Sequence, residues 1–434
     1  MRIHLSALGC KLNQSEMERL ARQLVSAGHQ VVADPAEADL CICNTCTVTH
    51  IAARKSRQAL RQLRRSNARA SLVATGCYAE ISPQEASETG EVNWVVGNAD
   101  KDRLFELLAA RIPGFAGPSS APAPADLLAQ RAQGLPRVAS RTRAFVKIQD
   151  GCDNACAYCI VSKARGPARS YPAEHVLAEI QDRLAEGYQE VVLTGVHIGS
   201  YGREWGSSLA QLVQEVLQQT AVPRLRLSSI EPWDFSAELA ALWQDRRLCR
   251  HLHLPLQSGC DATLARMNRK YTAAQYAGMA AMIRAAIPQV ALTTDVIVGF
   301  PGETDDEFQA SLEFVRQQGY AKVHVFKYSL REGTAAAAMA GQLPPEVKET
   351  RSRLMHRVGE QTARQFQASL LGQVLDVLWE TSPARGPQGL PLWSGLTDNY
   401  VRVELESAEA LANTITRARL AKPGPRGLEA ESAE

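Results

Sequence analysis

The stretch Cys152-Asp-Asn-Ala-Cys156-Ala-Tyr-Cys159 places three thiols at spacings of four and three residues, in a loop that follows a predicted strand. Three thiolates spaced in this way fit three corners of a cubane iron–sulfur cluster, whereas a closed cluster normally takes four cysteine ligands. The fourth iron would keep an open position, and an open metal position is where chemistry takes place. The stretch therefore predicts a reactive iron–sulfur site.

Two other uses of these three cysteines stay open. They would form a zinc site if His175 or Cys260 supplied a distant fourth ligand, although zinc ligands more often come as two Cys-x-x-Cys pairs. The chain would then be a non-catalytic zinc protein that binds nucleic acid. A disulfide is disfavoured, because ten cysteines in 434 residues are few and nothing else indicates an oxidising compartment.

The sequence that follows residue 143 repeats a strand–helix pattern with a long period. The predicted strands are 144–149, 190–194, 224–229, 251–256, 292–298 and 322–328, and a helical pattern follows each of them. Six such units predict a partial (βα)6 barrel, with reactive groups at the C-terminal ends of the strands, as in complete barrels. The cysteine triad follows the first strand and therefore lies at that end.

The first 112 residues alternate strands and helices more tightly. The predicted strands are 3–8, 40–44, 71–75 and 94–97, and this rhythm predicts a doubly wound parallel sheet. Cys10, Cys46 and Cys77 each lie just past the end of one of these strands. Because ligands bind at the carboxyl edge of such a sheet, the three thiols could converge on a second cluster. As separate small apolar residues they would equally suit a buried core.

Composition and charge predict the remaining domain limits, the possible partners and the location of the protein. We expect a Pro/Ala-rich linker at 113–137, the barrel at 138–369, a small all-β domain at 370–420 and a disordered tail at 421–434. A net charge of +2 does not indicate nucleic acid, but residues 51–79 carry seven basic side chains and no acidic one. No apolar run approaches the ~20 residues that cross a bilayer, and the start lacks a secretory signal, so we expect a cytoplasmic protein without membrane contact.

The triad resembles the signature of radical S-adenosylmethionine enzymes, and three further segments resemble the cysteine motifs of the methylthiotransferases. These segments are Leu8-Gly-Cys-Lys-Leu-Asn-Gln14, Asn44-Thr-Cys-Thr-Val-Thr49 and Thr75-Gly-Cys-Tyr-Ala79. The first of them, with Ala164-Arg-Gly-Pro-Ala-Arg-Ser170, is most similar to the branch that acts on N6-threonylcarbamoyladenosine next to the anticodon. The branch that acts on isopentenyladenosine tends to have Gln-Met-Asn after the first cysteine. The branch that acts on an aspartate of a ribosomal protein tends to have Pro-Lys-Asn.

This resemblance implies an N-terminal methylthiotransferase domain, a radical core and a C-terminal TRAM domain. It implies that a C–H bond is replaced by C–SCH3, with two 4Fe-4S clusters and S-adenosylmethionine as cofactors. The first cluster would cleave S-adenosylmethionine to a radical, and the auxiliary cluster would deliver sulfur. A second S-adenosylmethionine would supply the methyl group. The implied partners are a tRNA anticodon stem-loop and an electron donor such as flavodoxin or ferredoxin.

The resemblance also assigns residues to these roles. The auxiliary cluster would be held by Cys10, Cys46 and Cys77, and the radical cluster by Cys152, Cys156 and Cys159. Residues near the triad and after the barrel strands would bind S-adenosylmethionine: Tyr158, Gly195, Val196, Ser229, Glu231 and Asp295. Basic side chains would meet the tRNA: Arg54, Lys55, Arg57, Arg61, Arg165 and Arg169.

Overall fold

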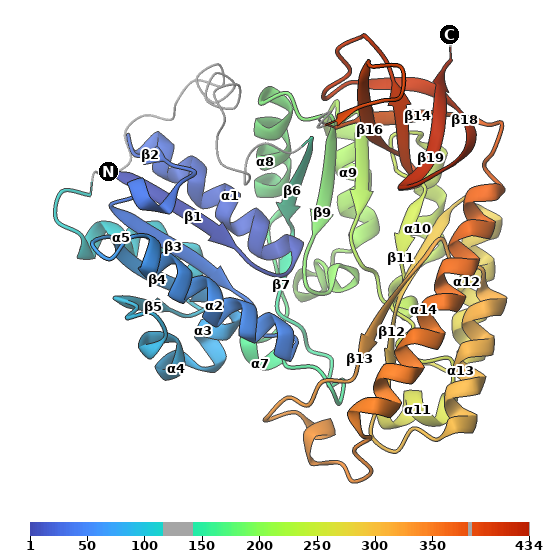
Figure 1. Cartoon of the computed structure of the whole chain (residues 1–434), viewed down its shortest axis with the longest axis horizontal. Helices are drawn as coiled ribbons and strands as arrows, with labels where there is room; N and C mark the ends of the chain where they lie inside the picture. Colours follow the sequence, from blue (N-terminus) through green and yellow to red (C-terminus); the bar gives the residue numbers. More distant parts are fainter. Residues whose placement is uncertain (116–141, 381–383, 434) are drawn as a thin grey trace.

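A parallel sheet, a partial barrel and a small closed β barrel follow one another along the chain (Figure 1). The computed structural model describes residues 1–115, 142–380 and 384–433. Most of the predicted linker lies outside the described residues. Its first part, 113–115, belongs to the N-terminal unit, because Phe115 packs on the rings of Phe105 and His29. Within the described residues, no helix is both long and apolar enough to cross a membrane.

The N-terminal unit is a five-stranded parallel sheet with the strand order β2-β1-β3-β4-β5. The strands are β1 (Arg2–Ala7), β2 (Gln30–Val31), β3 (Leu40–Thr45), β4 (Ser71–Gly76) and β5 (Trp94–Val96). Helices α1 (Lys11–Ser26) and α5 (Leu104–Arg111) supply the apolar cover of one face, and α2 (His50–Ser66), α3 (Cys77–Ile81) and α4 (Pro83–Glu88) that of the other. This confirms the predicted doubly wound sheet.

Strand β3 is buried along its whole length, as expected for a central parallel strand with both faces covered. Its side chains alternate between the two cores. Leu40 and Ile42 belong to the core under α1, whereas Cys41 and Cys43 belong to the core under α2. Cys41 and Cys43 therefore pack as small apolar residues.

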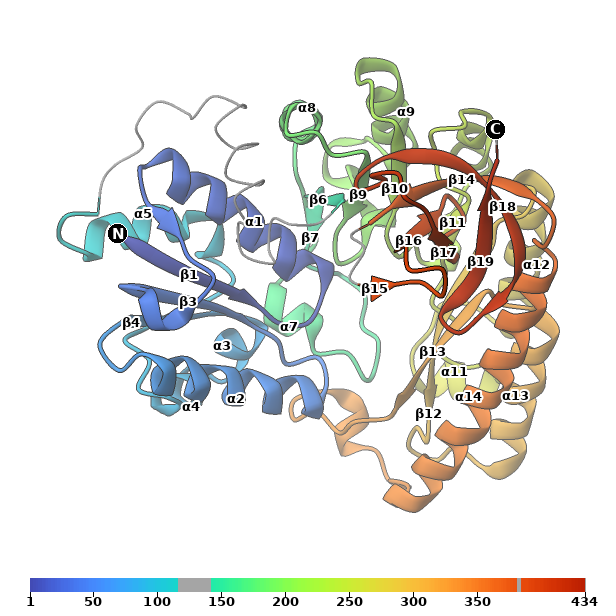
Figure 2. The ribbon, with the colours of Figure 1, turned by 45° about the horizontal axis from the view of Figure 1, so that its top comes forward.

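The central unit is a partial barrel of six parallel strands. They are β6 (Arg143–Lys147), β9 (Glu190–Thr194), β10 (Arg224–Leu227), β11 (His251–His253), β12 (Ala291–Val298) and β13 (Lys322–Lys327). Two sheets, β10-β9-β6 and β11-β12-β13, meet through the isolated bridges Leu225–Leu248 and Ser229–His253. The barrel thus has an open side between β6 and β13, and the N-terminal unit lies next to β6 (Figures 1 and 2).

The barrel helices form the outer layer because each has one apolar stripe. They are α8 (Ala173–Ala185), α9 (Leu209–Gln219), α10 (Ala237–Ala241), α11 (Asp261–Arg266), α12 (Ala273–Ala286), α13 (Asp305–Gln318) and α14 (Pro345–Ala368). In α9, for example, Leu209, Leu212, Val213 and Val216 recur at helical spacing and all face the core. The Ser208 hydroxyl caps this helix by accepting from the backbone N–H of Gln211.

The C-terminal unit is a small β barrel. Its strands are β14 (Val374–Trp379), β15 (Ala384–Arg385), β16 (Pro391–Thr397), β17 (Arg402–Glu406), β18 (Ile415–Gly424) and β19 (Gly427–Ser432). They pair in the order β14-β18-β19-β17-β16-β15, and a further β14–β16 pairing closes the ring. A small all-β domain was predicted at 370–420, but the strands continue past residue 420 to Ser432.

The prediction of a disordered tail at 421–434 is wrong. Strand β18 continues to Gly424, and β19 pairs with both β18 and β17. The tail is ordered because Leu428 enters the barrel core, where only 1% of its surface remains exposed. The alternation of apolar and charged residues in β19 is short and lies among Pro, Gly and Glu residues, so composition alone suggested disorder.

The loop between β16 and β17 seals the N-terminal end of the central barrel. Arg224 donates to the carbonyl oxygens of Leu396 and Thr397 at 3.0 and 2.9 Å, and Arg226 donates to that of Asp398 at 2.9 Å. The guanidinium of Arg226 also lies 4.6 Å from the centre of the Tyr400 ring. These contacts fix the C-terminal unit against the barrel.

Replacement of Leu428 by alanine tests the order of the tail. We expect Leu428→Ala to destabilise the C-terminal barrel by about 2–5 kcal/mol, because a buried leucine leaves a cavity behind. The matched variant Glu431→Ala, on the exposed side of β19, should change stability by less than about 0.5 kcal/mol. Urea unfolding followed by tryptophan fluorescence measures both, and equal behaviour of the two variants would contradict an ordered tail.

Candidate functional site

The cysteine triad lies in the loop after β6 and β7 (Gln149–Asp150), and each of its sulfur atoms has a nitrogen donor close by. The backbone N–H groups of Asn154 and Val161 lie 3.4 Å from the Sγ atoms of Cys152 and Cys159. Arg269 Nη1 lies 3.4 Å from Cys156 Sγ. Such donors favour thiolates, and a bound metal would remove the thiol protons outright. Burial nevertheless raises the pKa of Cys156, and that of Cys159 to about 12, so these two side chains are neutral thiols until a metal binds.

Two buried pairs bring positive charge to the triad. His197 Nδ1 lies 3.9 Å from Cys152 Sγ, and its Nε2 is hydrogen-bonded to Asp234. Burial opposes protonation, but the hydrogen bonds to Asp234 and Cys152 raise the pKa of His197 to about 9. The second pair joins Arg269 to Glu231. Partners of this kind orient metal ligands and adjust the electronic properties of a cluster.

Cys10, Cys46 and Cys77 meet at the carboxyl edge of the N-terminal sheet. They follow β1, β3 and β4, and all three line one cavity of about 730 Å³. Gly9 makes the approach possible, because a Cβ atom there would lie 2.5 Å from Cys46 Sγ. Burial raises the pKa of Cys46 to about 11, so its thiol is neutral until a metal binds.

The set Cys10, Cys46 and Cys77 and one member of the triad, Cys159, open onto adjoining cavities. The large cavity contains the first set, and a second cavity of about 210 Å³ is lined by Cys159 and Tyr158. Both cavities share four lining residues: Val48, Val161, Asp295 and Phe326. Helix α7 (Val161–Arg165) begins two residues after Cys159 and packs against α3, which begins at Cys77. The short helix therefore sets the spacing between the sets.

The zinc alternative requires ligands that converge on a single ion. Within the described part of the chain, no group of three or more His, Cys, Asp or Glu side chains is arranged to hold a single metal ion. A mononuclear site needs all its ligands around one ion, whereas in a cubane cluster each thiolate binds a different iron. Three thiols that share a cavity without converging on one point would suit a cluster better than a single ion.

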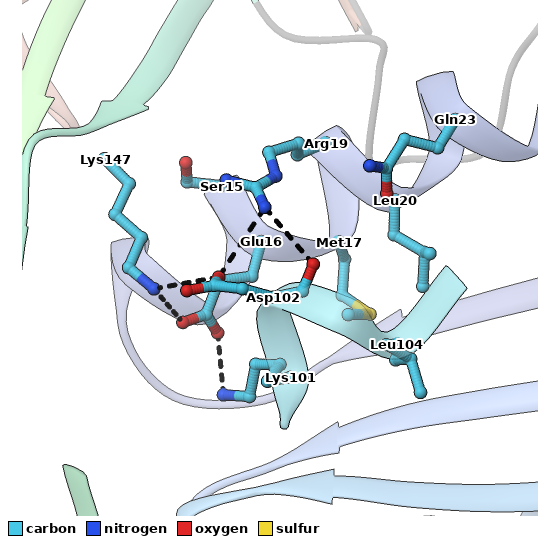
Figure 3. Close-up of a pocket in the computed structure, with 10 residues that line it drawn as sticks. All are labelled: Ser15, Glu16, Met17, Arg19, Leu20, Gln23, Lys101, Asp102, Leu104 and Lys147. Carbon is cyan, nitrogen blue, oxygen red and sulfur yellow. Dashed lines mark hydrogen bonds and ion pairs between the residues drawn. The ribbon is translucent and has the colours of Figure 1, made fainter. Parts of the chain in front are cut away.

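A buried ion network joins the N-terminal unit to the barrel, and Figure 3 shows its centre. Glu16 accepts from Lys101 at 2.8 Å, from Lys147 at 3.1 Å and from Arg165 at 3.0 Å. Burial would raise the pKa of Glu16, but these three cations hold it well below its usual range. The small cavity beside the network encloses about 20 Å³, room for a water molecule and not for a substrate.

This network corrects the prediction that Arg165 binds RNA. Arg165 is buried, and its guanidinium also contacts Asp150 at 2.8 Å and Asn13 at 2.6 Å. Its charge is neutralised by Glu16 of the N-terminal unit and Asp150 of the barrel, close to Cys10, Cys46 and Cys77. Arg169 is 44% exposed but pairs with Asp102 and Asp150 at 3.3 and 3.5 Å, so its charge is also partly neutralised.

The residues predicted to bind S-adenosylmethionine lie in three places. Gly195, Val196, Ser229 and Asp295 line the large cavity, Tyr158 lines the small one, and Glu231 lies behind the triad, paired with Arg269. At the end of β9, Gln149 Oε1 accepts from the N–H groups of Val196 and His197 at 3.1 and 2.8 Å. Because these N–H groups are engaged by Gln149, the backbone carbonyl oxygens of this segment are the groups that could accept from the amino group of S-adenosylmethionine.

Several residues of the site were not singled out from the sequence. His197, Asp234, Arg269 and Gln149 contact the triad or its neighbours, yet none of them lies in the triad motif. Their signal would have been their position shortly beyond barrel strands, where active groups gather. Arg269 lies farther away, in a loop, and only the fold brings it to Cys156.

The predicted basic helix is α2, and its cations divide into two groups. Arg54, Lys55 and Arg61 are exposed to solvent. Arg57 instead pairs with Glu85 at 3.2 Å and lies 5.8 Å from the centre of the Tyr78 ring. Three of the four predicted residues are therefore available to phosphates.

Comparison with known proteins places this geometry in a family. Residues 2–97 match the model of an uncharacterised protein family, UPF0004, and residues 146–315 match that of the radical SAM superfamily. The threonylcarbamoyladenosine tRNA methylthiotransferase MtaB of Bacillus subtilis (strain 168) is 35% identical over 96% of this chain and 93% of its own length. The protein of the same name from Chlamydia pneumoniae is 36% identical over 98% and 97%. The chain belongs to the threonylcarbamoyladenosine tRNA methylthiotransferase family.

Solved structures agree at the level of the fold. The radical S-adenosylmethionine methyltransferase TsrM from Kitasatospora setae, with cobalamin and a [4Fe-4S] cluster bound, superposes with a TM-score of 0.58. It is 17% identical, and the match covers 77% of each chain. A radical SAM domain implies S-adenosylmethionine and one 4Fe-4S cluster for this methylthiotransferase family member, and the triad loop fits that cluster.

Removal of the Glu16 charge tests the ion network. We expect Glu16→Gln to destabilise the protein by about 3 kcal/mol at pH 7, because buried cations lose their shared partner. The folded-state pKa of Glu16 is depressed, so its contribution is present above the unfolded pKa of about 4.3 and is lost as the pH falls further. The difference between wild type and variant in denaturant unfolding should therefore shrink below about pH 4.

The exposed ion pair between Glu106 and Arg103 supplies the control for this experiment. Glu106→Gln should change the unfolding midpoint little at any pH, because an exposed pair contributes at most about 1 kcal/mol. A Glu16→Gln protein as stable as Glu106→Gln would contradict the importance of the network.

Salt dependence tests the surface of α2. A variant with Arg54, Lys55 and Arg61 changed to alanine should bind an anticodon stem-loop more weakly. The slope of log K against log salt should become shallower by about 0.7–0.9 for each phosphate that the protein no longer neutralises. Arg57→Ala should leave that slope unchanged, because its charge is engaged by Glu85. Equal slopes for the triple variant and wild type would exclude α2 from the RNA interface.

Proposed function

We propose that this protein is a radical S-adenosylmethionine tRNA methylthiotransferase with two 4Fe-4S clusters. It converts N6-threonylcarbamoyladenosine next to the anticodon to the 2-methylthio derivative. The observation that carries the proposal is that Cys10, Cys46 and Cys77 line one cavity at the edge of the N-terminal sheet, and that Cys159 of the triad lines the adjoining cavity at the mouth of the barrel. Relatives of this name at 35–36% identity over nearly the whole chain support the substrate.

The roles of the two clusters follow from their positions. Cys152, Cys156 and Cys159 would hold the cluster that binds and cleaves S-adenosylmethionine, since they lie where active groups of barrels gather. The other set, Cys10, Cys46 and Cys77, would hold the auxiliary cluster that supplies sulfur. The protein's own residues would position both clusters. Arg269 and His197 lie beside the triad, and Asn13 and Asn98 lie beside Cys10 and Cys77.

Residues of the barrel would bind S-adenosylmethionine between these clusters. The carbonyl oxygens of Gly195 and Val196 suit its amino group, and the hydroxyl of Ser229 and the carboxylate of Asp295 suit ribose hydroxyls. Tyr158 packs edge-on against Phe300 and would support the cluster loop. The Glu231 carboxylate would act through Arg269, which it holds beside Cys156.

The mouth of the cavities has the features of a single-stranded RNA site. Val48 and Phe326 line both cavities and are 45% and 42% exposed. The backbone N–H of His50 contacts Ser329 Oγ at 3.3 Å, which brings the exposed Ile51 and Leu330 to the same rim. Unstacked bases of an anticodon loop would pack on this apolar rim, and α2 would meet the phosphates. The electron would come from a donor such as flavodoxin or ferredoxin.

Iron analysis with paired variants tests the two-cluster proposal. After anaerobic reconstitution the wild type should contain about eight irons per chain, and each triple cysteine-to-alanine variant about four. The Cys152/Cys156/Cys159 variant should no longer form 5′-deoxyadenosine. The Cys10/Cys46/Cys77 variant should still form it but make no methylthio nucleoside.

Cys260→Ala provides the matched control, because Cys260 is only partly buried and belongs to neither set. It should keep about eight irons and full activity. Zinc in place of iron in the wild type, or full activity in either triple variant, would contradict the proposal. Nucleoside mass spectrometry of tRNA from a strain that lacks the gene should show the 2-methylthio group missing.

A further inference from the structure

The large cavity is lined by more basic than acidic side chains. Its cations are Lys11, Arg165 and Lys322, and its one carboxylate among the lining residues is Asp295. His253 also lines the cavity, as do His251 and His324, whose pKa values burial lowers, so that these two are neutral at pH 7. Asp295 is paired with His253 at 3.3 Å, and Arg165 is neutralised by Glu16 and Asp150. The lysines are thus the cations of this cavity wall that the described residues leave without a carboxylate.

Lys11 is the lysine next to the set formed by Cys10, Cys46 and Cys77. It is the first residue of α1, follows Cys10 directly, and is partly buried in the cavity wall. Among the described residues, no carboxylate forms an ion pair with its amino group, and the charged groups that act on it include two arginines, Arg143 and Arg226, and one carboxylate, Glu190. Burial of a cation without an anion is costly, so such a side chain suits an anionic ligand.

The groups around Lys11 do not supply that anion. Arg143, Arg226, Glu190 and Tyr400 are the charged or titratable groups that act on it from the barrel and the C-terminal unit. Glu190 is fully buried and already bound by Arg224 at 2.9 Å and Arg226 at 2.7 Å. The Tyr400 hydroxyl accepts from Arg143 at 2.8 Å. Arg143 is also paired with Glu380 at 3.4 Å. Both carboxylates at this end of the cavity are therefore engaged by arginines and do not pair with Lys11.

The proposed substrate carries an anion in the matching place. The threonylcarbamoyl group ends in a free carboxylate, whereas an isopentenyl group is neutral and apolar. Sulfur from the cluster at Cys10, Cys46 and Cys77 must reach C2 of the adenine, so the base and its N6 substituent occupy the same cavity. We propose that Lys11 binds the threonyl carboxylate and thereby selects threonylcarbamoyladenosine over adenosines with neutral N6 substituents. This inference rests on the function proposed above.

Lys322 is the competing candidate. It also lines the cavity, but it is exposed and starts β13 on the other side of the open seam of the barrel. An exposed lysine is well hydrated and gains less from an anion than a partly buried one. Lys11 is therefore the residue that distinguishes substrates, and Lys322→Gln is its matched control.

The test compares two stem-loops that differ in one charge. One carries N6-threonylcarbamoyladenosine, and the other carries the same nucleoside with the carboxylate as its methyl ester. Binding to the reconstituted holoenzyme is measured by fluorescence anisotropy at fixed salt, and methylthiolation by nucleoside mass spectrometry. Iron content is measured for every variant, because residue 11 adjoins a proposed cluster ligand.

We expect the wild type to bind the acid about tenfold or more tightly than the ester, as a hydrogen bond to a charged group predicts. Lys11→Gln should lose this preference with its iron content and its affinity for the ester unchanged. Lys11→Arg should retain most of the preference, and Lys322→Gln should retain all of it.

Three results would overturn the inference. They are an undiminished preference in Lys11→Gln, a preference lost in Lys322→Gln instead, or an equal loss for acid and ester in Lys11→Gln together with lost iron. If neither stem-loop is methylthiolated by the wild type, but the wild type prefers the acid and Lys11→Gln loses that preference, the proposed function is contradicted while the role of Lys11 in recognition is supported.

Discussion

The buried carboxylate of Glu16 holds two halves of the active site together. It comes from the N-terminal unit, and two of its three cationic partners, Lys147 and Arg165, come from the barrel. Arg165 ends the short helix that begins just after Cys159, and Glu16 lies in the helix that begins just after Cys10. The ion network around Glu16 thus links the segments that carry the two cysteine sets. Loss of the cationic partners of a buried carboxylate is strongly destabilising. The distance between the two cysteine sets is therefore firmly fixed.

This rigidity would matter for the two clusters that we propose. A radical formed at one of them would have to meet a substrate that also touches the other, so the distance between the two cysteine sets should vary little. The connection through Glu16 acts beside the cavities, while Asn98 contacts both Cys77 Sγ and the carbonyl of Ala164 within the same seam. The boundary between the N-terminal unit and the barrel therefore forms part of the functional site.

All three units contribute to the large cavity. The N-terminal unit supplies Cys10 and Lys11, the barrel supplies Asp295 and His253, and the C-terminal unit supplies Tyr400. The last residue gives the small β barrel a part in the site itself, because its β16–β17 loop closes the bottom of the cavity. Arg226, fully buried beneath Tyr400, couples that loop to Glu190 in the barrel wall.

Local pattern was enough to predict the doubly wound sheet, the six barrel strands and the shared sheet edge of Cys10, Cys46 and Cys77, because spacing and strand ends are properties of neighbouring residues. Arg165 and the tail show where this fails. Arg165 lies 149 residues from Glu16 along the chain, so nothing nearby revealed that its charge is buried. Leu428 gains its burial from β17 and β18, which the tail's composition does not reveal. The sequence by itself determined which thiols are spaced to bind metal; the tertiary structure alone decided which charges are neutralised and which remain for a substrate, since ion pairs form between distant segments.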